Sequence, residues 1–166
     1  MKIRPCGATC YVLLLTLGLL HYSANAQNNR RNKYACSETN PASQCSASNT
    51  CGSSSAACMV DVKRTGYSAS ATPGIPNAKG NSLFCVRTGT TVTWQSTAKN
   101  TGFLIDFGPS SPFDPPDAIM GGSKRSASVT AARPGCFLYA FQATDSTGTY
   151  GMSQASQAEL IVIGNK

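Results

Sequence analysis

From Cys58 onward, apolar residues recur in short runs with a period of two. Cys58, Val60 and Val62 occupy every second position, which is the period of a strand with one buried face. Further β-prone runs are expected at residues 83–86, 90–95, 103–107, 127–129, 137–141 and 160–163. These runs are short and separated by turn-forming residues. The pattern therefore predicts an all-β antiparallel sandwich or barrel rather than a parallel α/β sheet.

Two of the segments between these runs are expected to lie outside the sheets. Residues 71–80 are rich in Pro and Gly, which predicts a loop. A short helical turn is expected at 115–120, because Asp114 could cap it, Pro115 suits its first position and Gly121 could end it.

The first 26 residues resemble an export signal. Lys2 and Arg4 precede an apolar stretch, and Ala24-Asn25-Ala26 is a small-residue cleavage site. The apolar stretch is too short to span a bilayer of ~30 Å as a helix. We expect a soluble, secreted protein in the extracellular space or periplasm, without membrane insertion.

Cysteine usage agrees with export. Removal of residues 1–26 takes away two of the eight cysteines and leaves six: Cys36, Cys45, Cys51, Cys58, Cys85 and Cys136. Thiols oxidise outside the cytoplasm, so these six predict three disulfides whose pairing the sequence does not choose. Residues 27–57 are poor in large apolar residues, and we expect an irregular, disulfide-tied extension before a β domain at 58–166. One hypothesis pairs Cys85 with Cys136 and leaves the four N-terminal cysteines to pair among themselves.

The charge of the mature chain is moderate and scattered. The 14 basic residues become 12 when Lys2 and Arg4 are removed, against 7 acidic residues, so the net charge is +5. The basic clusters lack the interleaved aromatic residues of a base-stacking surface. We therefore expect solvated charge and no nucleic-acid partner.

Three segments of the β domain resemble the cupredoxin family. The sequence Cys85-Val-Arg-Thr-Gly-Thr-Thr-Val-Thr-Trp94 is similar to the family's V-x-x-G-x-x-V-x-W segment, and Pro134-Gly-Cys-Phe-Leu-Tyr-Ala-Phe141 is similar to its P-G-x-Y-x-Y-x-C strand. Gly151-Met152, followed by an apolar run at 158–163, resembles its G-M segment and closing strand. The resemblance implies a Greek-key β-sandwich over roughly residues 58–164. An immunoglobulin-like sandwich is the alternative topology.

The same resemblance implies a copper site that this sequence does not complete. Family members hold type 1 copper with two histidines and a cysteine, often with a distant methionine. Phe141 stands at the cysteine position, Thr101-Gly102-Phe103 at the first histidine position, and the mature chain has no histidine because His21 belongs to the signal. Only Met152 matches a ligand. We therefore expect no metal and no cofactor; the alternative is a copper or electron-transfer protein with atypical ligands.

Catalysis also finds little support in the composition. Without histidine, a hydrolase with an imidazole base is excluded, although a Ser–Lys pair stays formally open. Asp106, Asp114 and Asp117 form the one acidic cluster and could serve a carboxylate-based hydrolase or bind calcium. The plainer interpretation is that Asp114 and Asp117 cap the helical turn while Asp106 faces solvent. We expect that the protein is not an enzyme.

Other residues have a structural and a functional interpretation. Three methionines could form a copper(I) site, but such residues are more often core fillers (Met59, Met120, Met152). Trp94 could stack on a sugar, but its place in the pattern predicts the core. The segment with Phe107, Pro109, Pro112 and Phe113 could be a rigid recognition loop or a crossover between sheets. We therefore expect a monomeric, metal-free binding or structural module for an extracellular or cell-surface protein or glycan.

Overall fold

A computed structural model describes Cys36 and residues 38–122, 125–152 and 158–164. The chain divides into two compact units, Met1–Lys33 and Tyr34–Lys166, and every described residue belongs to the second. The expected export signal at 1–26 therefore lies outside the described residues. None of the helices within the described ranges is long and apolar enough to cross a membrane.

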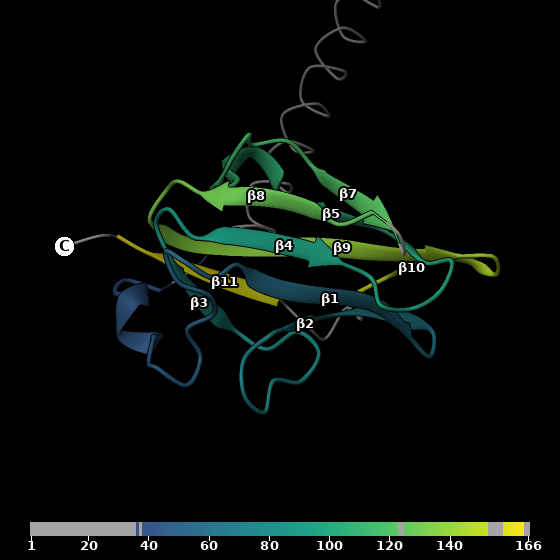
Figure 1. The fold of residues 1–166 in the computed structure, drawn as a ribbon, viewed down its shortest axis with the longest axis horizontal. Helices are drawn as coiled ribbons and strands as arrows, with labels where there is room; N and C mark the ends of the chain where they lie inside the picture. Colours follow the sequence, from purple (N-terminus) through teal and green to yellow (C-terminus); the bar gives the residue numbers. More distant parts are fainter. Residues whose placement is uncertain (1–35, 37, 123–124, 153–157, 165–166) are drawn as a thin grey trace, which may run out of the picture. The chain divides into compact units, whose positions relative to one another are not determined.

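Eleven strands in the described residues form two sheets, which Figure 1 shows as two layers. The five-stranded sheet has the order β2–β1–β4–β8–β6. Its strands are β1 (Cys58–Thr65), β2 (Ser68–Pro73), β4 (Thr91–Gln95), β6 (Phe113–Asp114) and β8 (Ala127–Ala131). The six-stranded sheet has the order β3–β11–β9–β5–β7, with β10 paired to β9. Its strands are β3 (Phe84–Arg87), β5 (Gly102–Asp106), β7 (Ile119–Gly122), β9 (Gly135–Asp145), β10 (Gly148–Gly151) and β11 (Ala158–Ile163).

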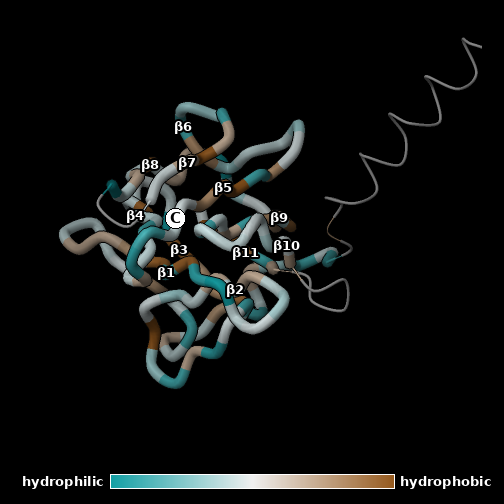
Figure 2. Tube along the Cα trace, turned by 90° about the vertical axis from the view of Figure 1, so that its right-hand side faces the viewer, coloured by the Kyte–Doolittle hydropathy of each residue, from teal (hydrophilic) through white to brown (hydrophobic). Residues whose placement is uncertain are grey.

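The predicted all-β class is confirmed, and the core lies between the sheets. Along β1, Cys58, Val60 and Val62 are fully buried, while Met59 and Lys63 are exposed. Trp94 is fully buried, as expected of a core residue, and its ring meets those of Phe84, Phe107 and Tyr139 at centroid distances of 6.4, 6.3 and 5.5 Å. Figure 2 shows hydrophobic stretches along strands such as β3 and β5 and hydrophilic stretches mainly in the connections.

Strands that are distant in sequence lie side by side. The predicted antiparallel pairing holds for most ladders between the described strands but was wrong for two, because β1 pairs with β4 in parallel and β3 pairs with β11 in parallel. Parallel neighbours need long crossover connections. The chain therefore passes repeatedly from one sheet to the other instead of forming a simple meander.

Two local predictions were wrong. The predicted helical turn at 115–120 is absent from the described structure: the Asp114-Pro115 peptide is cis, and Ile119–Gly122 forms β7 beside β5. Cross-strand pairing with β5 outweighs the capping signals there. The predicted loop at 71–80 begins too early, because Ser68–Pro73 is strand β2. Asn81 closes the free edge of β2, since its N–H donates to the Ala71 carbonyl (2.6 Å) and its Oδ1 accepts from the Ala71 N–H (3.1 Å).

The described part of the N-terminal extension is irregular, as expected, except for the 3₁₀ helix η1 (Pro41–Gln44). Near its end the extension runs along the free edge of β3: the Cys85 N–H donates to the Asn49 carbonyl, and the Cys51 N–H donates to the Cys85 carbonyl. Figure 1 shows η1 beside β3 and β11. Ile161 lies on the outer face of β11 and is nevertheless fully buried. The extension thus acts as a cover for this face of the six-stranded sheet.

Three disulfides among the described cysteines hold the extension in place. They join Cys36 to Cys136, Cys45 to Cys85, and Cys51 to Cys58, with sequence separations of 100, 40 and 7. Each bridge encloses the next along the chain, so the three are fully nested. The prediction that six cysteines form three disulfides is confirmed.

The hypothesis that Cys85 pairs with Cys136 was wrong. Both residues lie opposite Ile161, Cys85 on the β3 side of β11 and Cys136 on the β9 side. Neighbouring strands are ~4.8 Å apart, so these two Cα atoms are roughly 10 Å apart, beyond the ~7 Å limit for a disulfide. Each instead pairs with a cysteine of the extension that covers this face.

Candidate functional site

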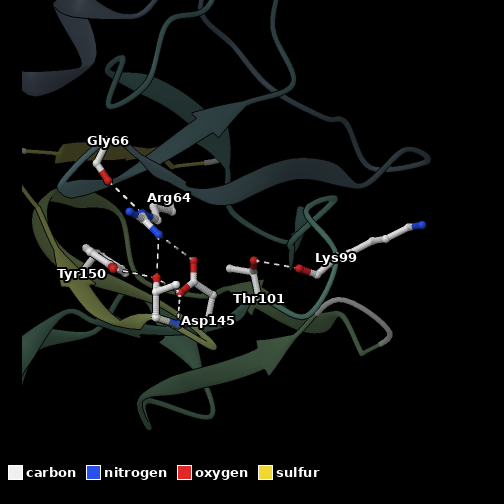
Figure 3. Close-up of polar contacts among 7 residues, drawn as sticks. Arg64, Gly66, Lys99, Thr101, Asp145 and Tyr150 are labelled. Carbon is white, nitrogen blue, oxygen red and sulfur yellow. Dashed lines mark hydrogen bonds and ion pairs between the residues drawn. The ribbon is translucent and has the colours of Figure 1, made fainter.

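The end of the sandwich that carries the β1–β2 and β9–β10 hairpin tips (Figure 1) holds a connected polar cluster. Its centre is Arg64, near the end of β1. The Arg64 Nε donates to the Gly66 carbonyl (2.8 Å), and Nη1 donates to Thr147 Oγ1 (2.6 Å) and Asp145 Oδ2 (3.3 Å). The guanidinium also lies over the Tyr150 ring, 4.1 Å from its centroid. Figure 3 shows these side chains converging from the two hairpins. We call Arg64, Asp145, Thr147 and Tyr150 the hairpin clamp.

Local sequence explains why the two hairpins present these groups. Thr65 pairs with Ser68, so Gly66 and Tyr67 are the two loop residues of the β1–β2 hairpin. Gly66 has φ of +61°, the value that the first loop residue of a type II′ turn requires. In the β9–β10 hairpin, Asp145 pairs with Gly148 across another two-residue loop. Tight loops of this kind fix the register, and with it the position of the flanking side chains.

The polar groups of the clamp form hydrogen bonds with one another. Asp145 Oδ1 accepts from the Thr147 N–H (2.8 Å) and from Thr147 Oγ1 (2.5 Å), and Thr147 Oγ1 lies 2.7 Å from the Tyr150 hydroxyl. The hydroxyl and amide of Thr147, and then Arg64, hold the pKa of Asp145 below its usual value. A carboxylate with a lowered pKa is a poor general base at neutral pH. The arrangement therefore fixes two hairpins rather than activating a nucleophile.

The residues that the cupredoxin resemblance would place at copper-ligand positions lie in or beside the core. Phe141 is 2% exposed and its ring centroid lies 5.9 Å from that of Tyr139, while Phe103 is 5% and Thr101 4% exposed. Met152, the one matching ligand type, is partly buried against the core and forms a bridge with Ala69 of β2. Aromatic packing thus occupies the region where the resemblance would place imidazole and thiolate ligands.

The buried aromatic core contains two polar groups that find no hydrogen-bond partner among the described residues, Trp94 Nε1 and Tyr139 Oη. Complete burial raises the pKa of the Tyr139 phenol far above its usual value, so it stays neutral. Neither group reaches the surface, so they serve packing and not exchange with solvent.

The segment proposed as a recognition loop is mostly internal. Phe107 and Phe113 are 4% and 2% exposed, Pro112 is buried, and Pro109 is exposed. The segment leads from β5 in one sheet through the 3₁₀ helix η2 (Gly108–Ser110) to β6 in the other. It is therefore a crossover whose aromatic ends pack together, with ring centroids 5.2 Å apart. A role in recognition stays a prediction that rests on Pro109 and its immediate neighbours.

The acidic cluster does not behave as expected. Asp106 is half-buried rather than solvent-facing, and its Oδ1 accepts from the Gly108 N–H (2.7 Å) at the start of η2. Asp114 and Asp117 are exposed and cap no helical turn. Within the described ranges, the one group of three His, Cys, Asp or Glu residues with ligand atoms within 4.8 Å of one another is Cys36, Cys136 and Glu159. Its two sulfurs are joined in a disulfide.

The methionines are dispersed. Met59 and Met120 are 39% and 64% exposed, on strands of different sheets, and Met152 alone of these three packs against the core. The expectation of core fillers holds for Met152 and was wrong for the other two. Met59 and Met120 lie on the outer faces of opposite sheets, so the structure does not bring them together as a copper(I) site.

Sequence reasoning missed a surface beside the clamp. Tyr67, at the tip of the β1–β2 hairpin, is 96% exposed. A hollow of about 470 Å³ opens on the same hairpin. Its lining carries hydroxyl, amide and amine groups from Lys63, Thr65, Ser68, Ser70, Thr72 and Asn81, together with apolar surface that includes Ala69 and Ala78. The Gly66-Tyr67 pair flanked by β-prone residues was the available signal, because glycine before a loop aromatic indicates a tight, exposed turn.

Comparison with known proteins adds no relative. No protein-family model matches the chain, and no curated protein matches it.

Proposed function

We propose that the chain is a secreted, metal-free binding module on a cupredoxin-like sandwich, and that it binds an extracellular glycan at the β1–β2 hairpin. The observation that carries the proposal is the hairpin clamp. The charged and polar groups of the clamp bind one another and hold the two hairpins together. One of these hairpins carries Tyr67 at its tip, where nearly all of the residue's surface is exposed. The Arg64 Nε donates to the carbonyl of Gly66, the residue before Tyr67, so the clamp holds the backbone that carries the exposed ring and less backbone freedom is lost when a ligand binds.

The metal-free part of the proposal is supported by packing. Phe103 and Phe141 are buried aromatic residues at positions where the family resemblance would require ligands. A rival copper protein would have to recruit atypical ligands, and a rival hydrolase would need two aspartates converging on one cleft. Asp106 is bound to the backbone of η2, whereas Asp114 and Asp117 are exposed.

The choice of a glycan is supported by the hollow beside Tyr67. Sugars present hydroxyl groups for hydrogen bonds and C–H faces for aromatic rings. The hollow offers hydroxyl, amide and amine groups, and Tyr67 offers the ring. The export signal at 1–26 and the three disulfides support an oxidising compartment, where such a ligand would be met.

The first experiment measures metal content and free thiols in one sample of the secreted protein. Stoichiometric copper, or a thiol that added metal protects from alkylation, would refute the metal-free proposal. We expect neither.

The second experiment measures binding to immobilised polysaccharides. Tyr67→Ala should reduce binding at least tenfold, while Met120→Ala, which removes an exposed side chain from another edge, should leave it unchanged. Absence of binding to every polysaccharide, combined with retention by a purified cell-surface protein, would overturn the glycan and point to a protein ligand.

A further inference from the structure

The three disulfides differ in access to solvent. Cys51 and Cys58 are both buried, and Cys85 is fully buried opposite Cys45. In Cys36–Cys136, both residues are partly exposed. A reductant must reach a sulfur along the line of the S–S bond, so access controls the rate of attack. Among the bridges between described cysteines, Cys36–Cys136 is the one open to a dissolved thiol on either side.

A carboxyl group lies directly against this bridge. Glu159 Oε1 is 2.9 Å from Cys136 Sγ and 3.6 Å from Cys36 Sγ. The contact follows from the sheet register: Glu159 of β11 pairs with Leu138 of β9, two residues from Cys136, so both side chains share the outer face of the sheet. A disulfide sulfur has no hydrogen to donate. The contact is therefore a hydrogen bond only when the carboxyl group is protonated and donates to sulfur.

The surroundings of Glu159 favour the protonated form. Partial burial, and then repulsion by Glu38, raise the pKa of the Glu159 carboxyl above its usual value. The residue of β9 that pairs with Glu159 is the uncharged Leu138. On the other side of β11, β3 begins at the uncharged Phe84, which pairs with Leu160. The 3₁₀ helix η1 (Pro41–Gln44) also carries no charged side chain. Glu38 is thus the charged group that acts on this carboxyl among the described residues.

We propose that Cys36–Cys136 is a site of thiol–disulfide exchange for small thiols and dithiols, with Glu159 as the catalytic acid. A thiolate attacks Cys36 Sγ and forms a new S–S bond, while the Cys36–Cys136 bond breaks and Cys136 Sγ leaves with the electron pair. Glu159 gives its proton to Cys136 Sγ, the nearer sulfur. A second thiolate, or the second arm of a dithiol, then displaces Cys36. The disulfide is reduced to two thiols, and the reductant is oxidised to its disulfide.

The ionised form of Glu159 has the opposite effect. A carboxylate beside the bridge repels both the incoming thiolate and the thiolate that leaves. Exchange at this bridge is therefore assisted when Glu159 is protonated and resisted when it is ionised.

The test uses the purified, fully oxidised protein and limiting dithiothreitol from about pH 4 to about pH 8, a range that brackets the usual carboxyl pKa. Released thiols are trapped by alkylation and assigned by peptide mass mapping. We expect Cys36 and Cys136 to be labelled first. Early labelling of Cys45 and Cys85, or of Cys51 and Cys58, would overturn the assignment of the site.

The role of Glu159 is tested by the ratio of reduction rates in wild type and Glu159→Gln at each pH, which cancels the pH dependence of the reductant. General acids contribute roughly 100-fold or more to rates in enzymes. We expect wild type to be reduced at least about tenfold faster than Glu159→Gln at low pH. At high pH we expect wild type to be reduced more slowly than the variant. Glu38→Gln, which removes the repulsion, should move the fall of this ratio to lower pH. A ratio that does not change with pH would refute the acid role of Glu159, and a fall that Glu38→Gln does not move would refute the contribution of Glu38.

Discussion

Replacement of Phe141 by alanine tests whether an aromatic ring truly fills the position at which a copper ligand would stand. The Phe141 ring is 2% exposed, pairs across the sheet with Ile105 and lies against the Tyr139 ring at 5.9 Å. Truncation of such a residue removes its transfer free energy and leaves a cavity. The expected loss in the free energy of unfolding is about 3–5 kcal/mol, out of about 5–15 kcal/mol for a typical domain.

The assay is thermal and urea unfolding with all three disulfides intact. Each kcal/mol shifts the Tm of a domain of this size by roughly 4 °C, so the Tm should fall by about 12–20 °C. Met120→Ala, at a side chain that is 64% exposed, is the matched control and should change stability by less than about 0.5 kcal/mol. A loss of about 1 kcal/mol or less for Phe141→Ala would mean that the ring is not packed, and the reasoning against a ligand site would fail.

Three further changes test the hairpin clamp and the sheet packing. Arg64→Lys should raise amide hydrogen exchange in the β9–β10 hairpin several-fold, because an ammonium group cannot replace a planar guanidinium that donates to several acceptors; unchanged protection would contradict the clamp. The lowered pKa of Asp145 means that its charge stabilises the fold above the usual carboxyl pKa and that this contribution is lost as the pH falls through the folded-state value. Asp145→Asn should therefore lower Tm at neutral pH, and its Tm should decrease less than that of wild type when the pH falls below about 4. The same decrease of Tm in acid for both proteins would count against the ion pair. Gly121→Ala would place a methyl group against the Phe103 ring and should cost about 1–3 kcal/mol. Gly151→Ala, whose added methyl has no atom of the described residues within 4 Å, should be nearly neutral.

The parts of the fold that sequence could predict are those with a strong local pattern. β1 was evident because Cys58, Val60 and Val62 meet the core while the residues between them do not. β2 was not, because Ser68–Pro73 consists of small residues and proline, and its strand form depends on pairing with β1 and on closure of its edge by Asn81.

The candidate site was less visible for the same reason. Arg64 and Asp145 are 81 positions apart, and nothing near either one signals the other. Their meeting depends on which strands become neighbours and where each hairpin turns. The loop from Phe107 to Phe113 shows the converse: its prolines and aromatic ends suggested display, but the pull of the core on two phenylalanine side chains decides where they lie.

Because the three disulfides are nested, the order in which the cysteines emerge during synthesis does not favour the native pairs. The ribosome delivers Cys36 and Cys45 long before Cys136 and Cys85, and the earliest available partner for each is another cysteine of the extension. Oxidation in order of appearance would join Cys36 to Cys45 and Cys85 to Cys136, and of the native bridges would give only Cys51–Cys58. Reshuffling takes seconds to hours, depending on the oxidant and on a disulfide isomerase. The yield of native protein should therefore depend on a disulfide isomerase in the host more than on the supply of oxidant.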